Sequence, residues 1–272
     1  MRPAPLPVPD ALDDTGDLAS LVAAPWMGVL WLGVLPLRLV QAELVSVFVV
    51  VGDDAAAYGD LLRAIAAAAA GAFVLATLGR AVFARACVLA LRTGRRPGRE
   101  ALAVGLTPFL THLYLALVAE VLFLSLFLSV VAVPLSMTMA ALAAATAPLA
   151  ERPGLVSPLR ELGRGAARPG PLLALVFVFG VAFVIAFANV GAVFFAGLWL
   201  AGAVPGVDVA PWVHRLAPGN PPFLILVTAG AVVFLEPFWI AAHVVLVHRA
   251  RSRETGQDLR AWFERLRRPE AA

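Results

Sequence analysis

Two long apolar runs, residues 109–133 and 171–203, constrain the fold of this chain more than any other feature. Each is longer than the roughly 20 apolar residues that a helix needs to cross the hydrocarbon core of a bilayer. Charged residues make up 14% of the 272 positions, whereas soluble domains carry about 25%. The sequence therefore predicts an all-α, polytopic integral membrane protein.

Six membrane-crossing helices account for the apolar segments. The stretch 101–150 is too long for one crossing, so we divide it near Pro134, and its second half either spans the bilayer or lies along its surface. The expected crossings are residues 24–51, 61–91, 101–133, 134–150, 171–203 and 222–248. In the fifth crossing, small residues four apart favour close helix approach. These small residues are Ala182, Ala186, Gly191, Ala192 and Ala196.

The arginines indicate which ends face the cytoplasm. All 21 basic residues are arginines, and with six crossings 16 of them lie on one side of the membrane. They occupy the N-terminal tail, the loops 92–100 and 151–170, and the C-terminal tail, whereas the links 52–60 and 202–221 hold only Arg215. Basic residues near membrane helices mark the cytoplasmic side. Both termini are therefore expected to be cytoplasmic, and the alanine- and arginine-rich composition indicates a bacterial cytoplasmic membrane protein.

The chain divides into three parts. Residues 1–20 are rich in proline and aspartate and are expected to form a flexible leader. Residues 21–248 form the six-helix domain, and residues 249–272 form a basic tail. Neither end is long enough to build a hydrophobic core of its own.

No catalytic or metal-binding motif is present in the sequence. The motifs GxSxG and HExxH and the phosphate-binding loop are absent, and the four histidines lack metal-ligand spacing. The lone Cys87 excludes a disulfide within the chain. We therefore expect no enzymatic activity and no cofactor.

Charged residues near the middle of three crossings form the candidate site. Arg38, Glu120 and Glu236 lie at similar depths in the first, third and sixth crossings. A charge at the bilayer centre costs about 2.5–3.5 kcal/mol on insertion scales, so such residues face the bundle interior or a cavity. Two interpretations stay open: structural pairing that locks the bundle, or a proton- or ion-linked transport site. Arg80 and Arg85 are expected instead to extend towards the cytoplasmic interface.

The C-terminal tail carries an amphipathic basic helix. Leu259, Trp262, Phe263 and Leu266 follow the i, i+3, i+4, i+7 spacing of one helix face. Such a helix binds anionic lipid at the membrane surface, and its closeness to the last crossing disfavours a nucleic acid partner. The residues expected at the lipid surface are Arg260, Trp262, Phe263, Arg265, Arg267 and Arg268.

The end of the chain resembles a known family. Glu236-Pro237-Phe238 in the last crossing is followed by the basic residues Arg249, Arg251 and Arg253 and then by Glu254, Gly256, Asp258 and Leu259. This order is similar to the ending of the glycerophosphoryl diester phosphodiesterase membrane-domain type family, although Thr255 separates Glu254 from Gly256. The loop 148–168, with Glu151 and the stretch 157–162, is also similar. The resemblance implies a bacterial membrane module of undefined role, without the phosphodiesterase domain.

The sequence thus favours a non-enzymatic membrane scaffold, or a subunit with a membrane protein partner, in a bacterial envelope process. The alternative is a small-solute or ion-linked permease that uses Arg38, Glu120 and Glu236.

Overall fold

The computed structural model describes residues 8–51, 59–126, 138, 141, 144–145, 169–215, 217 and 220–256. Within these ranges the chain forms helices and short connections, without a strand. The helices are α1 (Val8–Val22), α2 (Gly28–Val51), α3 (Gly59–Thr93), α4 (Leu106–Leu126), α7 (Pro169–Gly202), α8 (Ala210–Arg215) and α9 (Pro221–Thr255). A π-helical turn, Ala23–Met27, joins α1 to α2, and a 3-10 turn, Arg99–Leu102, precedes α4. The predicted all-α class is confirmed.

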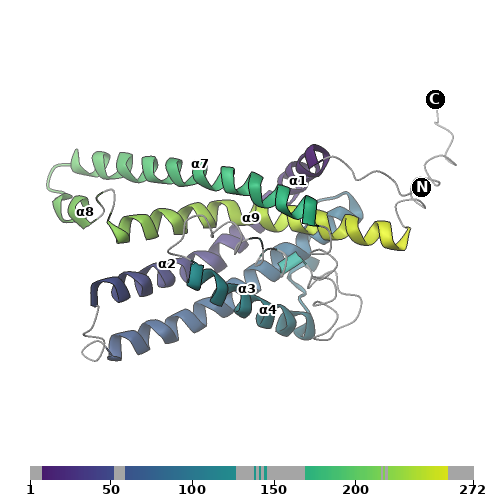
Figure 1. The fold of residues 1–272 in the computed structure, drawn as a ribbon, viewed down its shortest axis with the longest axis horizontal. Coiled ribbons are helices and arrows are strands. Elements are labelled where there is room, and N and C mark those ends of the chain that lie inside the picture. The colour runs from purple at the N-terminus through teal and green to yellow at the C-terminus, as the bar shows by residue number, and fades with distance from the viewer. Residues whose placement is uncertain are drawn as a thin grey trace.

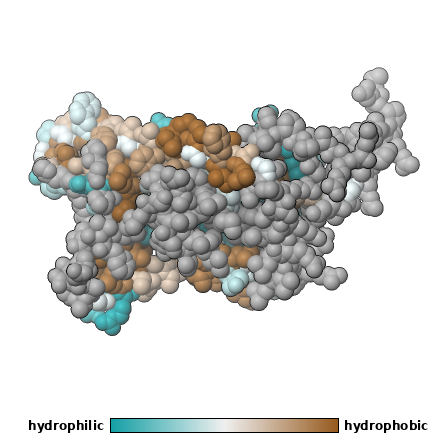
Figure 2. Space-filling model, viewed as in Figure 1, coloured by the Kyte–Doolittle hydropathy of each residue, from teal (hydrophilic) through white to brown (hydrophobic). Residues whose placement is uncertain are grey.

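Four stretches have the length and apolar composition to cross a membrane: Asp13–Leu44, Gly59–Thr93, Leu173–Gly202 and Pro222–Ala250. Their outer surfaces are apolar, with Leu32, Phe177 and Trp199 each about three-quarters exposed. Figure 2 shows such residues along α7, and hydrophilic residues where α3 begins. Apolar side chains exposed over whole helices match a hydrocarbon environment rather than water.

Helix α9 lies at the centre of the arrangement and contacts α1, α2, α3 and α7 (Figure 1). Its face towards the bundle is buried from Ala231 to Val247 almost without interruption, and Trp239 is fully buried there. The Trp239 indole stacks on the Phe179 ring of α7, with 4.7 Å between ring centroids. Most of the core is therefore built around α9.

Helices α2 and α3 form an antiparallel hairpin with touching backbones. A Cβ atom on Gly33 would lie 2.8 Å from the carbonyl oxygen of Leu75 and 3.3 Å from the Cα of Gly79. Only glycine allows this approach, because any side chain at Gly33 would overlap the α3 backbone.

Residues 8–20 are helical, and one face of this helix is packed from Thr15 onward, so the prediction of a flexible leader is wrong from Val8 onward. Thr15, Leu18, Ala19 and Val22 are buried on one face of α1, which contacts α9 and α3. Their i, i+3, i+4, i+7 spacing is that of an amphipathic helix, a pattern that outweighs the proline- and aspartate-rich composition. Residues 1–7 of the predicted leader lie outside the described residues.

The basic loop predicted at residues 92–100 is confirmed as the connection between α3, which ends at Thr93, and the 3-10 turn that begins at Arg99. Gly94 ends α3 with φ +63°, and its N–H donates to the Ala90 carbonyl, as in a left-handed helix cap. The Gly98 N–H donates to Oε1 of Glu100, which holds the pKa of that carboxyl below its usual range. The indole N–H of Trp26 donates to the Pro97 carbonyl at 3.1 Å and ties this loop to the start of α2.

The predicted fourth crossing, residues 134–150, lies mostly outside the described residues. Thr138, Ala141, Ala144 and Ala145 are described, and all four are buried. Their spacing of three to four fits one helix face. The number of crossings remains a prediction at this point.

Candidate functional site: a buried arginine–glutamate cluster

Glu236 lies at the midpoint of the α9 apolar stretch, 14 residues from each end of Pro222–Ala250. Its side chain is 2% exposed and points at α2 and α3. The Nε of Arg80 donates to Oε1 of Glu236 at 2.5 Å. A terminal nitrogen of Arg38, Nη2, lies 3.8 Å from Oε2 of the same carboxylate. One carboxylate therefore connects three helices.

The two arginines are 1% exposed and differ in their contact with Glu236. Arg80 makes a charge-assisted hydrogen bond, the stronger kind of contact. The 3.8 Å separation from Arg38 exceeds hydrogen-bond length, so its attraction to Glu236 is Coulombic. Arg38 also donates through Nη1 to Oε1 of Gln41 at 2.6 Å, one helical turn along α2.

The structure brings together two of the three predicted residues, Arg38 and Glu236. Glu120 belongs to α4, but its side chain lies outside the described residues. The predicted lipid-surface residues Arg260, Trp262, Phe263, Arg265, Arg267 and Arg268 also lie outside the described residues.

The expectation that Arg80 extends to the interface is wrong. Helix α3 continues to Thr93, so Arg80 lies 13 residues, or about 20 Å, before its end. Its side chain is 1% exposed and pairs with Glu236 inside the bundle instead. Arg85 lies closer to the end, and its Nε donates to the Glu100 carbonyl at 3.0 Å.

A buried histidine accompanies the cluster. His112 of α4 is fully buried, and the charge of Arg80 acts on its ring. Neither ring nitrogen of His112 has a hydrogen-bond partner among the described residues. His243 of α9, by contrast, bonds through Nδ1 to the Trp239 carbonyl at 2.7 Å. In the described part of the chain, no three His, Cys, Asp or Glu side chains gather to hold a metal ion.

Next to Glu236, Pro237 creates a second link between α9 and α2. Proline has no N–H, so the carbonyl of Val233, four residues earlier, receives no helical hydrogen bond. The indole N–H of Trp31 on α2 donates to this carbonyl at 3.0 Å. In an apolar medium a free carbonyl is costly, so Trp31 offsets the loss that Pro237 causes.

The chain matches no protein-family model, no curated protein and no solved structure. The family resemblance of residues 236–259 accordingly stays a prediction.

Proposed function

We propose that this chain is a non-enzymatic, polytopic protein of the bacterial cytoplasmic membrane that acts as a scaffold or partner subunit in an envelope process. The observation that carries the proposal is the closed cluster at Glu236. Its carboxylate faces arginines on two neighbouring helices, and all three side chains are at most 2% exposed. A cluster that is buried to this extent holds the helices together and has no exposed surface to which a solute could bind.

We further propose six crossings with both termini in the cytoplasm. The distribution of charge supports this orientation. The loop after α3 and the end of α9 lie at one end of the bundle, and the end of α2, the start of α3 and the end of α7 lie at the other (Figure 1). Arg92, Arg95, Arg96 and Arg99 lie in that loop region, and Arg249, Arg251 and Arg253 lie near the end of α9. This asymmetry follows the positive-inside rule.

We also propose that residues 257–272 lie on anionic lipid at the cytoplasmic surface, through the arginines and aromatic residues named above. The basic residues that end α9 support this placement, because arginines next to a membrane helix are attracted to anionic headgroups and start the tail at the membrane surface. The similarity to the glycerophosphoryl diester phosphodiesterase membrane-domain type family is compatible with such a module.

The rival function is an ion-linked permease, and His112 is the observation in its favour. A fully buried imidazole within electrostatic reach of Arg80, without a hydrogen bond from the described residues, is a group that a proton pathway could use. The two proposals differ in whether water reaches the cluster.

Thiol labelling of Thr77→Cys in a Cys87→Ala background separates these two proposals. Thr77 is fully buried one turn before Arg80, on the same side of α3. In a scaffold, a small hydrophilic thiol reagent should leave Cys at position 77 unmodified from either side of a proteoliposome. A Gly94→Cys control in the exposed loop should react from the cytoplasmic side.

Reaction at position 77 from one side, in a protein that melts like its parent, would contradict the scaffold and favour the permease. Lack of reaction at both positions 77 and 94 would instead contradict the assigned exposure of the loop.

A further inference from the structure

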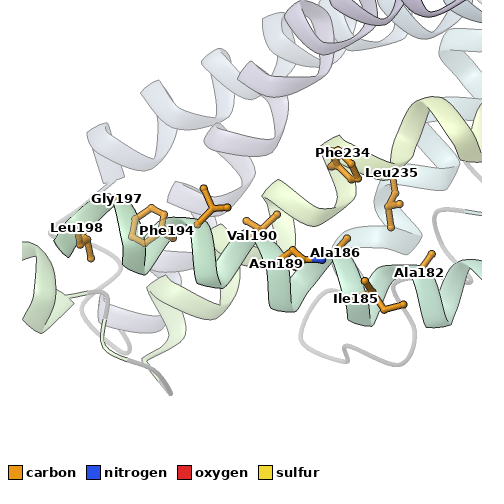
Figure 3. Close-up of a pocket in the computed structure, with 11 residues that line it drawn as sticks. Ala182, Ile185, Ala186, Asn189, Val190, Phe194, Gly197, Leu198, Phe234 and Leu235 are labelled. Carbon is orange, nitrogen blue, oxygen red and sulfur yellow. The ribbon is translucent and has the colours of Figure 1, made fainter. Parts of the chain in front are cut away.

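Helix α7 packs on α9 (Figure 1), and only 22% of its most apolar 18-residue window is buried. Phe177, Val184, Val193 and Trp199 are all more than three-fifths exposed. A groove of about 910 Å³ runs between α7 and α9 (Figure 3). Ala186, Asn189, Val193 and Gly197 contribute to its α7 side, and Phe234 and Leu235 lie on its α9 side.

Asn189 is the one polar residue among those that line this groove. It is 13 residues from the end of the apolar stretch Leu173–Gly202, which places it about 20 Å from that end. The Asn189 side chain is exposed, and its amide makes no hydrogen bond within the part of the chain that the structure describes. An amide in hydrocarbon without a partner is strongly disfavoured.

Lipid cannot satisfy this amide. Acyl chains offer no hydrogen-bond donor or acceptor, and headgroups lie outside the hydrocarbon core, whose half-thickness is about 15 Å. The partner must therefore present a donor and an acceptor at the same depth.

We propose that the α7–α9 groove is the interface of a homodimer in which the Asn189 side chains of two copies bond to each other. Copies inserted with the same orientation are related by an axis along the membrane normal, so Asn189 lies at the same depth in both. A carboxamide holds both donor and acceptor, so two copies can exchange N–H···O=C bonds.

The apolar surroundings of Asn189 suit close packing against the second copy. Ile185 and Val193 lie one turn before and one turn after Asn189, and both are exposed. Ala186 and Gly197 are small residues on the α7 side of the groove, so a facing helix can approach the α7 backbone closely. The Ile185 and Val193 side chains of one copy then fill the groove of the other.

The direct test measures dimerisation of the full chain in liposomes by energy transfer between labelled copies, as the protein-to-lipid ratio varies. Asn189→Leu should raise the dissociation constant about tenfold, which corresponds to about 1.4 kcal/mol for the lost hydrogen bonds. Asn189→Gln, which keeps an amide, should remain close to the parent. The matched control is Ala188→Leu, since Ala188 is also exposed but points about 100° away.

Cysteine cross-linking in a Cys87→Ala background locates the interface. Ile185→Cys should form a disulfide-linked dimer, whereas Val184→Cys, on a different side of α7, should not. An unchanged dissociation constant for Asn189→Leu, or equal cross-linking at positions 184 and 185, would overturn the proposal. A monomer at every protein-to-lipid ratio, with or without a lipid in the groove, would also overturn it. All variants should melt like the parent, because the substituted side chains are exposed.

Discussion

At the scale of single residues, Glu236 joins α9 to α3 through Arg80 and attracts Arg38 on α2. Removing one partner of a buried ion pair costs about 3–5 kcal/mol, because the other charge stays in a low-dielectric medium. The two kinds of partner respond differently to that loss. A glutamate can take up a proton and become neutral, whereas an arginine cannot lose its charge.

This asymmetry predicts an order of stabilities in detergent. Glu236→Gln should lower the melting temperature most, since it removes the carboxylate that both arginines face. Arg80→Leu should have a smaller effect, and Arg38→Leu the smallest, because Arg38 lies 3.8 Å from the carboxylate. Adding Arg80→Leu to Glu236→Gln should restore part of the lost stability.

Thermal unfolding of the purified variants checks this order. Glu43→Gln is the control, since Glu43 is an exposed carboxylate on α2. A Glu236→Gln protein that melts like its parent would remove the structural role of the cluster and strengthen the permease interpretation.

At the scale of helices, Trp31 and Pro237 should be energetically coupled. Trp31→Phe removes the donor to the Val233 carbonyl and should cost about 1 kcal/mol, the usual net value of a hydrogen bond. In a Pro237→Ala background the helix supplies its own donor to that carbonyl, so Trp31→Phe should cost little. Denaturant unfolding of the four proteins in mixed micelles gives the coupling energy. Equal costs in the two backgrounds would contradict the compensation.

The contact between α2 and α3 gives a second test with an internal control. Gly33→Ala would place a methyl group 2.8 Å from a backbone oxygen of α3, so it should separate the helices and lower the melting temperature. Gly71→Ala, in open space on α3, should be neutral or slightly stabilising because alanine favours the helix. If both variants melt alike, the close approach of α2 and α3 is wrong.

Sequence periodicity and depth predicted the helical class and the meeting of Arg38 with Glu236. They failed for Arg80 although the predicted end of that crossing, residue 91, is close to the observed end of α3, because the pairing with Glu236 of α9 depends on the tertiary structure. The packing of α1 was missed because composition was given more weight than the spacing of Thr15, Leu18 and Val22. The sequence predicts that Pro237 leaves the Val233 carbonyl without its helical donor. Only the tertiary structure shows that Trp31 supplies the replacement donor. The sequence shows that Asn189 lies within an apolar run, but the exposure of its side chain is known only from the tertiary structure.

At the scale of the whole molecule, one end of the bundle is basic, and this is the end that we propose faces the cytoplasm. The 92–100 loop and the end of α9, which carry seven arginines, lie at the same end of the bundle, opposite the end of α2 and the end of α7 (Figure 1). A bundle of this kind is held by core packing around α9 and by buried polar contacts, since lipid gives little hydrophobic drive between helices.

Sided thiol labelling of intact cells tests the central claim, a six-crossing membrane protein with cytoplasmic ends, most directly. Single cysteines at Asp54 and Ala210, in a Cys87→Ala background, should react with an impermeant reagent, because both links are expected outside. Cysteines at Gly94 and Gly163 should react only after the membrane is permeabilised. Labelling at Gly163 in intact cells would contradict six crossings, and labelling at Gly94 with protection at Ala210 would reverse the orientation.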